Sequence, residues 1–239
     1  MPTTSHASLW KKRSHISEMK KYYEAYDERY KAIHAKGHSW AGDACTPIVL
    51  DVIRRYGIEK ESKILEIGCG EGRDAKAVIE EGYDLLATDI SPEAIRYCRE
   101  RMPQYEDRFQ ILDCLSDGHS GKYDFIYAVA VVHMLLEDED RNRFYGFIRE
   151  HLSDDGIGLV CSMGDGETEF RTDASEAFEL KERNHPSGKV LVASTSCRMV
   201  SFCTFEKEIA QNGLIIEEKG ITTAFPDFDK LMYAVVRKN

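Results

Sequence analysis

The sequence predicts an α/β fold in which helices cover both faces of a parallel sheet. Two observations support this fold class. Between residues 60 and 163, short apolar runs of strand length alternate with amphipathic segments of helical length, an alternation typical of strand–helix–strand units. The chain has 239 residues, which is enough for one sizeable domain but short for two full catalytic domains. We therefore expect a single core.

Five apolar runs are the predicted strands of this region. They are Lys63–Ile67, Asp84–Asp89, Phe109–Leu112, Tyr123–Val129 and Ile157–Cys161. Amphipathic segments predict helices over 73–81, 92–101 and 137–152. The second of these helices has a clear start at Ser91-Pro92-Glu93, where an N-cap, a first-turn proline and an acid favoured by the helix dipole follow one another.

The alternation breaks over residues 164–203, which we interpret as an insertion. It contains Gly164-Asp165-Gly166, a charged stretch, and a strand-like run over 190–193. The pattern then resumes with a predicted helix over 204–212 and strands over 214–216 and 231–236. The expected organisation is an N-terminal helical cap segment over 1–45 and a main domain over 46–239, with 164–203 as a cap insertion.

Composition and charge exclude several classes of protein. Apolar residues make up 42% of the chain and charged residues 31%, with 6 Pro, which excludes a collagen-like or wholly disordered chain. The uncharged stretch Phe125–Leu136 is well short of the roughly 20 residues that span a bilayer. The formal net charge of −10 argues against nucleic-acid binding, because it opposes the phosphate backbone, and the short Lys11–Arg13 cluster is the one basic run we find.

Cysteine usage and the first residues indicate the compartment. The 7 cysteines are scattered, odd in number and without a C-x-x-C pair, which favours reduced thiols over a structural zinc site. Residues 1–10 lack the apolar core of an export signal. We expect a cytoplasmic protein without a membrane segment or a resident metal.

The most informative segment is Glu66-Ile67-Gly68-Cys69-Gly70-Glu71-Gly72, which lies between a predicted strand and a predicted helix. Glycines at such a turn allow close approach of a ligand, and the helix that follows offers unpaired N–H groups. A nucleotide-like ligand is therefore expected. A dinucleotide fingerprint requires a further glycine where this chain has Arg73, which weakens an NAD assignment.

With these residues the chain resembles the class I S-adenosylmethionine-dependent methyltransferases, whose motif has an acid two residues before three alternating glycines. Glu66, Gly68, Gly70 and Gly72 match that motif. The resemblance implies a Rossmann-like, doubly wound, mostly parallel seven-stranded sheet with an antiparallel last strand. It also implies S-adenosylmethionine as cofactor and S-adenosylhomocysteine as product. A phosphate or other nucleotide site on a similar fold is the alternative.

The resemblance also implies further cofactor-binding residues. Asp89, followed by Ile90, ends the second predicted strand, where the family holds the ribose hydroxyls, and charge-assisted hydrogen bonds give a physical reason for an acid there. Asp113 and Cys114 stand where the family contacts adenine, although Asp113 alone is also explained as a turn residue. Cys69 and Cys114 are interpreted as packing or backbone-contact residues. Ala128 and Val129 are expected beside the cofactor.

His133 is the candidate catalytic residue. It follows the fourth predicted strand, and the ordinary pKa of imidazole, about 6.5, suits proton transfer near neutrality. The alternative is a histidine that only packs beneath the cofactor site.

Six residues are candidates for contact with the substrate, each with a structural alternative. The tyrosines of the N-terminal segment, among them Tyr22, Tyr26 and Tyr30 at helical spacing, form a face that packs on the domain or covers the cofactor, with rings near the sulfonium cation. Asp165 is a substrate contact or a turn residue, and Arg198 holds an acceptor carboxylate or stabilises the insertion. The full set is Tyr23, Tyr26, Trp40, Asp165, His185 and Arg198.

A looser resemblance, carried by Tyr123–Ile126, Val131–Leu135 and the ending Lys230–Lys238, links the chain to the small-molecule branch that includes tellurite-resistance and thiopurine methyltransferases. The implied reaction is in-line transfer of a methyl group to a small-molecule acceptor, in which positioning supplies most of the rate enhancement. Methylation of a protein or RNA, and a non-catalytic module that binds S-adenosylmethionine, are the alternatives. The acceptor, its methylated atom and the oligomeric state stay open.

Overall fold

The computed structural model describes residues 20–223 and 230–239. Residues 1–19 of the expected N-terminal cap segment, with the Lys11–Arg13 cluster, lie outside the described residues. The strands of the main sheet are β1 (Lys63–Ile67), β2 (Asp84–Asp89), β3 (Phe109–Ile111), β4 (Tyr123–Val129), β5 (Leu152–Met163), β10 (Leu214–Thr222) and β11 (Leu231–Lys238). The helices are α1 (Ala25–His34), α2 (Pro47–Arg55), α3 (Arg73–Glu80), α4 (Pro92–Arg101), α5 (Asp138–His151) and α6 (Phe202–Gln211), with 3₁₀ turns η1 (Tyr22–Glu24), η2 (Pro103–Arg108), η3 (Val132–Met134) and η4 (Ala174–Glu176).

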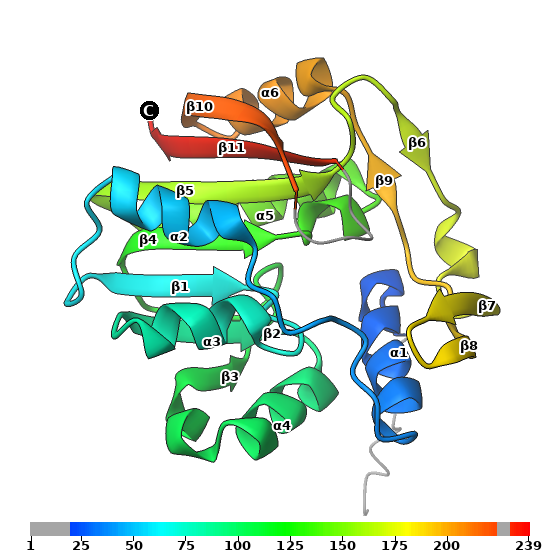
Figure 1. Ribbon diagram of the computed structural model, residues 1–239. Coiled ribbons are helices and arrows are strands. Elements are labelled where there is room, and N and C mark those ends of the chain that lie inside the picture. The colour runs from blue at the N-terminus through cyan, green and yellow to red at the C-terminus, as the bar shows by residue number, and fades with distance from the viewer. Residues whose placement is uncertain (1–19, 224–229) are drawn as a thin grey trace, which may run out of the picture.

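The main sheet has seven strands in the order β10-β11-β5-β4-β1-β2-β3 (Figure 1). β1 pairs in parallel with β2 and β4, β2 with β3, and β4 with β5, whereas β11 is antiparallel to both β5 and β10. The predicted doubly wound, mostly parallel sheet with an antiparallel last strand is confirmed.

Helices cover both faces of this sheet. Along β4, Phe125, Tyr127 and Val129 pack into one apolar cluster with residues of α2 and α3. Ile126 and Ala128 point to the opposite face and pack with residues of α5 and α6. This alternation is the period of two that a strand buried on both faces requires.

Local signals position the elements that border the site. Ser91 caps α4 by accepting a hydrogen bond from the Ala94 amide at 3.0 Å, and Gly82 follows α3 with φ +89°. Because only two residues, Ile90 and Ser91, separate the end of β2 from the start of α4, the capped helix start lies directly beside the carboxyl end of that strand.

The predicted insertion forms two small sheets. β6 (Phe170–Arg171) pairs with β9 (Arg198–Met199), and β7 (Leu180–His185) forms an antiparallel hairpin with β8 (Gly188–Ala193). Val190 and Val192 of the hairpin pack against Ile33 of α1. Figure 1 shows α1 beside this hairpin, at the end of the sheet to which the arrows of β1, β4 and β5 point.

Two strands, β5 and β10, are several residues longer than the runs that predicted them. β5 starts at Leu152, directly after α5, because the chain enters the sheet without a separate loop. β10 runs on to Thr222 through alternating exposed and half-buried residues, since an edge strand needs no continuous apolar run.

The described residues include no helix with the length and apolar character to cross a membrane. Across 20–223 and 230–239, no group of three or more His, Cys, Asp or Glu side chains is arranged to hold a metal ion.

Candidate functional site

The turn between β1 and α3, residues 68–72, is called the glycine turn here. Its three glycines have φ values of +72°, +53° and +78°, in the left-handed region that side chains disfavour. A Cβ on Gly68 would lie 2.4 Å from Cγ2 of Val131, and one on Gly70 would lie 2.7 Å from the Tyr30 hydroxyl. The turn therefore requires glycine for both conformation and space, and it leaves backbone facing the space above the strands.

Gly72 has a different role from the other two glycines. A Cβ there would lie 2.9 Å from Sγ of Cys98 and 2.9 Å from Cε of Met102. Gly72 thus allows α4 to pack closely beneath the turn, and it is not among the residues that line the pocket.

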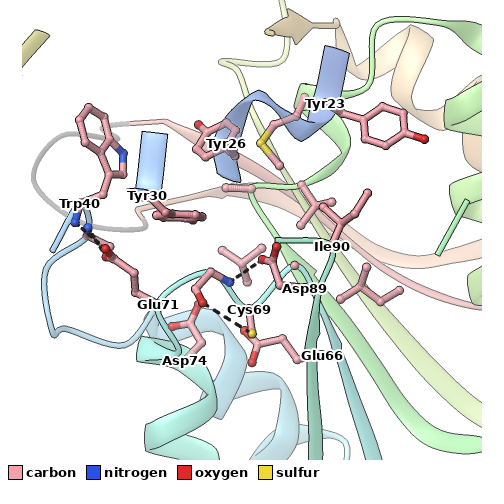
Figure 2. Close-up of a pocket in the computed structure, with 18 of the residues that line it drawn as sticks. Tyr23, Tyr26, Tyr30, Trp40, Glu66, Cys69, Glu71, Asp74, Asp89 and Ile90 are labelled. Carbon is pink, nitrogen blue, oxygen red and sulfur yellow. Dashed lines mark hydrogen bonds between the residues drawn. The ribbon is translucent and has the colours of Figure 1, made fainter. Parts of the chain in front are cut away.

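Asp89, at the end of β2, links the glycine turn to α4. Its carboxylate accepts hydrogen bonds from the Gly70 amide at 2.8 Å and from the Ser91 amide at 2.8 Å, the first of which is drawn in Figure 2. Burial raises the pKa of this carboxyl to about 6, despite the two amide donors. A buried carboxylate with lone pairs to spare is suited to accept further hydrogen bonds from a ligand.

Glu66 lies beneath the glycine turn and is 2% exposed. It accepts a hydrogen bond from the Tyr127 hydroxyl at 3.0 Å. Burial raises its pKa well above the ordinary value, and the nearby Asp74 carboxylate acts in the same direction. Asp74 in turn accepts from the backbone amide of Thr46 at 2.6 Å and from its hydroxyl at 3.0 Å.

A pocket of about 510 Å³ opens above the carboxyl ends of β1, β2, β3 and β4. The sheet order changes direction between β1 and β4, and α/β sheets bind ligands at such a switch point. The lining residues are Tyr23, Tyr26, Tyr30, Trp40, Ala41, Glu66, Ile67, Gly68, Cys69, Gly70, Glu71, Arg73, Asp74, Asp89, Ile90, Leu112, Asp113, Cys114, Leu115, Val129, Ala130, Val131, His133, Met134, Leu135, Asn184, His185 and Pro186.

Asp113 and Cys114 both lie at this pocket, after β3. Asp113 accepts from the Leu115 amide at 2.9 Å and the Ser116 hydroxyl at 2.6 Å, and Lys21 lies 3.3 Å away. These are the contacts of a turn residue, so the adenine contact stays a prediction. Burial raises the pKa of the Cys114 thiol, which keeps it protonated.

His133 lies in η3 and lines the pocket with 2% of its surface exposed. Its Nδ1 has no hydrogen-bond partner within the described part of the chain. Burial and the neighbouring Arg141 lower the pKa of its imidazole to about 4, so the ring is neutral at pH 7. A buried nitrogen without a partner is costly, and a bound ligand would satisfy it.

The backbone around His133 is fixed from both sides. Ala130 lines the pocket with φ +57°, a strained value for a residue with a side chain. Arg141 donates to the Val132 carbonyl at 2.6 Å and forms a buried ion pair with Glu208 at 2.6 Å. Of the two strand residues predicted beside the cofactor, Val129 lines the pocket, whereas Ala128 is buried in the cluster behind the sheet.

Three segments cover the pocket opposite the glycine turn: α1, residues 38–41 and the β7–β8 hairpin, together called the roof. Figure 2 shows the rings of Tyr23, Tyr26, Tyr30 and Trp40 on one side of the pocket and the carboxylates of Glu66, Asp74 and Asp89 on the other. Asp27 anchors α1 to the start of α4, because it accepts from the Ser91 hydroxyl at 2.6 Å and from the Glu93 amide at 3.1 Å.

Glu71 of the glycine turn holds a second part of the roof. Its carboxylate accepts from the backbone amides of Trp40 and Ala41, each at 2.6 Å. It also lies 2.8 Å from Nε2 of His34, whose Nδ1 is 2.7 Å from Glu93. Glu71 therefore joins the two sides of the pocket.

The hairpin completes the roof at residues 184–186. Nε2 of His185 lies 2.8 Å from the Ser39 carbonyl, and its ring stacks on Trp40 at a centroid distance of 6.0 Å. The structure thus brings four of the six candidate substrate residues, Tyr23, Tyr26, Trp40 and His185, into the pocket lining.

The other two substrate candidates do not line the pocket. Asp165 is engaged in a turn, where it accepts from the Thr168 amide at 2.8 Å. Arg198 donates to the Leu136 carbonyl at 2.6 Å and pairs with Asp138 at 2.7 Å. Their contact with substrate stays a prediction.

Sequence reasoning missed two residues that organise the site. Glu71 lies between Gly70 and Gly72 of the glycine motif. That position could have indicated that its side chain lies at the site. Arg29, which is described below, lies in a charged run of an N-terminal helix that has the pattern of a solvated surface. No local pattern distinguishes it.

The comparisons with known proteins agree with this geometry. Residues 65–157 match the family model described as a methyltransferase domain. This segment, from β1 into β5, is therefore similar to a methyltransferase domain. The predicted resemblance to the class I S-adenosylmethionine-dependent methyltransferases is confirmed.

Curated relatives match less than half of the chain. The chain is 28% identical over 121 residues to a probable S-adenosyl-L-methionine-dependent methyltransferase TehB of Haemophilus influenzae, covering 49% of this chain and 41% of that protein. It is 31% identical over 108 residues to hemagglutinin 1 of Eikenella corrodens, covering 43% of this chain and 35% of that protein. The matches thus span about two fifths of these relatives' length or less.

Solved structures share the fold of this chain over most of its length. One is the 1,6-didemethyltoxoflavin-N1-methyltransferase of Burkholderia thailandensis with bound 1,6-didemethyltoxoflavin and S-adenosylhomocysteine. The TM-score is 0.64 at 13% identity, with 87% of this chain and 84% of that chain covered.

Proposed function

We propose that this protein transfers the methyl group of S-adenosylmethionine to a small-molecule acceptor. The observation that carries the proposal is the pocket above the glycine turn, in which Asp89 is buried beside the backbone of Gly70. The solved relative described above holds both a small acceptor and S-adenosylhomocysteine, which supports the same combination here.

The residues present fit this cofactor. Gly68 and Gly70 both line the pocket, and because neither carries a side chain, their backbone is available to a bound nucleoside. Asp89 would hold the ribose hydroxyls, because its oxygens accept one amide hydrogen bond each and retain lone pairs. Glu66, Cys69, Ile90, Asp113, Cys114 and Val129 would line the remaining cofactor surface, with Gly72 and Ala128 packing behind it.

The cofactor, when bound, supplies a methyl group on a positively charged sulfur. The chain's own residues then position the acceptor in line with that methyl group and exclude water, which the roof does by covering the glycine turn. His133 would accept the acceptor's proton at Nδ1, since a neutral imidazole has a free lone pair there.

We further propose that residues 1–45 and 164–203 act as caps on a catalytic domain over 46–239. Tyr23, Tyr26 and Trp40 from the first segment, and His185 from the second, line the pocket, which supports the division.

The cysteines of the chain are free thiols in the structure, in keeping with a reducing compartment such as the cytoplasm.

Calorimetric titration with S-adenosylhomocysteine, with NAD as the parallel ligand, tests the cofactor assignment. We expect selective binding of S-adenosylhomocysteine, weakened in Asp89→Asn by about 1.5–3 kcal/mol because a hydrogen bond to a charged group is lost. Asp84→Asn, at the other end of β2, is the matched control and should bind normally. If Asp89→Asn bound S-adenosylhomocysteine as tightly as the unaltered protein, the ribose assignment would be contradicted. Binding of NAD in place of S-adenosylhomocysteine would contradict the cofactor assignment.

The same titration repeated with pH tests the charge state of Asp89. Because burial raises its pKa to about 6, and hydroxyl donors favour the ionised form, affinity should fall as pH decreases below about 6. The folding stability of the free protein depends on pH with the opposite sign. The raised pKa contributes stability that is complete below the ordinary pKa of about 3.9 and is lost as pH rises to about 6. Both pH dependences should be absent from Asp89→Asn.

A further inference from the structure

Arg29 of α1 is a buried cation without an acidic partner in the described residues. It is 5% exposed. Its guanidinium donates to the Ala193 carbonyl at 2.8 Å, the Ser194 carbonyl at 2.7 Å and the Thr195 hydroxyl at 2.9 Å. These partners are neutral, and burial lowers the pKa of the guanidinium. The positive charge is therefore not cancelled locally.

Two aromatic rings of the pocket enclose this cation. The guanidinium carbon lies 4.8 Å from the ring centroid of Tyr26 and 4.5 Å from that of Trp40. Both rings also line the pocket. An aromatic ring attracts a cation through its electron-rich faces, but a second cation stacked on these rings would meet the field of Arg29 through them. The aromatic side of the pocket is thus unsuited to a cationic acceptor.

Three of the carboxylates that line the pocket, those of Glu66, Asp74 and Asp89, lie across it from the rings that enclose Arg29 (Figure 2). Glu66 accepts from Tyr127, and Glu71 accepts from the amides of residues 40 and 41. Asp74 accepts a hydrogen bond from Thr46, and Asp89 accepts one from each of two backbone amides. Asp113 accepts a hydrogen bond from an amide of its own turn. An ammonium group stacked on the aromatic side would therefore lie near Arg29 and across the pocket from Glu66, Asp74 and Asp89 (Figure 2).

His133 supplies the polar anchor that the aromatic side lacks. Its buried Nδ1 has no partner among the described residues, and the surrounding lining residues Met134 and Leu135 are apolar. A hydrogen-bond donor on the edge of a flat acceptor would satisfy this nitrogen while the ring packs against Tyr26.

We propose that the acceptor is a planar aromatic compound, neutral or anionic, that presents an ionisable O–H or N–H to His133, and that Arg29 is the residue that excludes cationic acceptors. This proposal rests on the proposed methyltransferase function. In the transfer, a bond forms between the acceptor atom and the methyl carbon, and the methyl–sulfur bond breaks with its electron pair left on sulfur. The acceptor proton passes to Nδ1 of His133, so the positive charge of the sulfonium ends on imidazolium.

A series of phenols with the same ring and hydroxyl tests the charge preference: 4-ethylphenol, 4-hydroxyphenylacetate and tyramine. Each is titrated calorimetrically into the protein saturated with S-adenosylhomocysteine, which carries no sulfonium, so that any discrimination against the cation comes from the protein. We expect tyramine to bind at least about tenfold more weakly than the other two, as one unit charge at a distance of several ångströms predicts. 4-Ethylanisole, which lacks the donor, should also bind more weakly than 4-ethylphenol.

Equal or tighter binding of tyramine would overturn the charge argument, and equal binding of 4-ethylanisole would overturn the role of His133. Failure of all the phenols to bind, in a protein that still binds S-adenosylhomocysteine, would overturn the acceptor class and leave the cofactor assignment intact. Failure to bind S-adenosylhomocysteine itself would instead contradict the proposed function. Arg29→Gln should reduce the discrimination against tyramine, and the ligand series on the unaltered protein decides the proposal if that variant does not fold.

Discussion

The two sides of the pocket are built in different ways. On the side of the glycine turn, the critical residues lie within β1, β2 and the turns that follow them, and neighbouring strands hold them in register. On the side of the roof, α1 meets the β7–β8 hairpin through Arg29, which contacts a residue 164 positions away in the chain. The first side depends on local backbone geometry, and the second depends on a few long-range side-chain contacts. The two sides should therefore respond differently to mutation.

The largest expected effect is on the side of the glycine turn. Gly68→Ala places a Cβ at positive φ and 2.4 Å from the Val131 side chain, which cannot easily rotate because it is β-branched. We expect a loss of about 2–5 kcal/mol in the free energy of unfolding and no measurable binding of S-adenosylhomocysteine.

Gly82→Ala is the matched control, because its φ is +89° but no atom lies within 4 Å of the added Cβ. It should lose about 1 kcal/mol of stability and bind normally. Denaturant titration and calorimetry measure both quantities. If Gly68→Ala bound S-adenosylhomocysteine as well as Gly82→Ala, the close approach at Gly68 would be irrelevant to the ligand.

An intermediate effect is expected where the two sides meet. Glu71→Gln removes the charge that accepts from the amides of residues 40 and 41 and faces His34. We expect stability to fall by about 1–2 kcal/mol and acceptor binding to weaken more than binding of S-adenosylhomocysteine, since the roof loosens while Asp89 and the turn remain.

Glu81→Gln provides the comparison for Glu71→Gln, because it removes the same charge from an exposed ion pair with Arg54. Such pairs contribute about 0–1 kcal/mol, and neither ligand should bind differently. Thermal unfolding and the two titrations distinguish the variants. Equal losses in cofactor and acceptor binding for Glu71→Gln would mean that the two sides do not respond separately.

The smallest effect is expected for Asp165, which belongs to neither side. Its carboxylate is exposed and accepts hydrogen bonds within its own turn, which lower its pKa to about 2. Asp165→Asn should leave binding of S-adenosylhomocysteine and of an acceptor unchanged in calorimetry. Weaker acceptor binding in this variant would restore the substrate contact that the sequence suggested.

The sequence predicted the sheet and the position of the glycine turn well, because their signals are local. The run from Glu66 to Gly72 contains both the strand end and the turn, and Asp89 follows from the end of the next strand. Each feature depends on residues within a few positions of one another. Parallel pairing of β1 with β2 then places the glycine turn and Asp89 side by side.

The roof was predicted less completely for a physical reason. Strand β7 contains Lys181, Glu182 and Arg183, and it lacks the apolar alternation of a strand because its partner β8 supplies the contact with α1. Tyr22 was expected on one face with Tyr26, but it lies in a 3₁₀ turn before α1 and donates to Asp140 at 2.6 Å. A short turn at a helix start changes which residues share a face, and composition does not show it.

The contact between Arg29 and Ala193 also has a consequence for the order in which the protein forms. Closing a loop of 164 residues is entropically costly and is repaid only after both ends are already structured. The neighbouring strands β1 and β2 need no such closure. During refolding, we therefore expect the sheet to form before the pocket, so that secondary structure returns earlier than the capacity to bind a ligand. A ligand that contacts both sides would then bind only after the pocket has formed. It would slow unfolding of the native state more than it speeds folding.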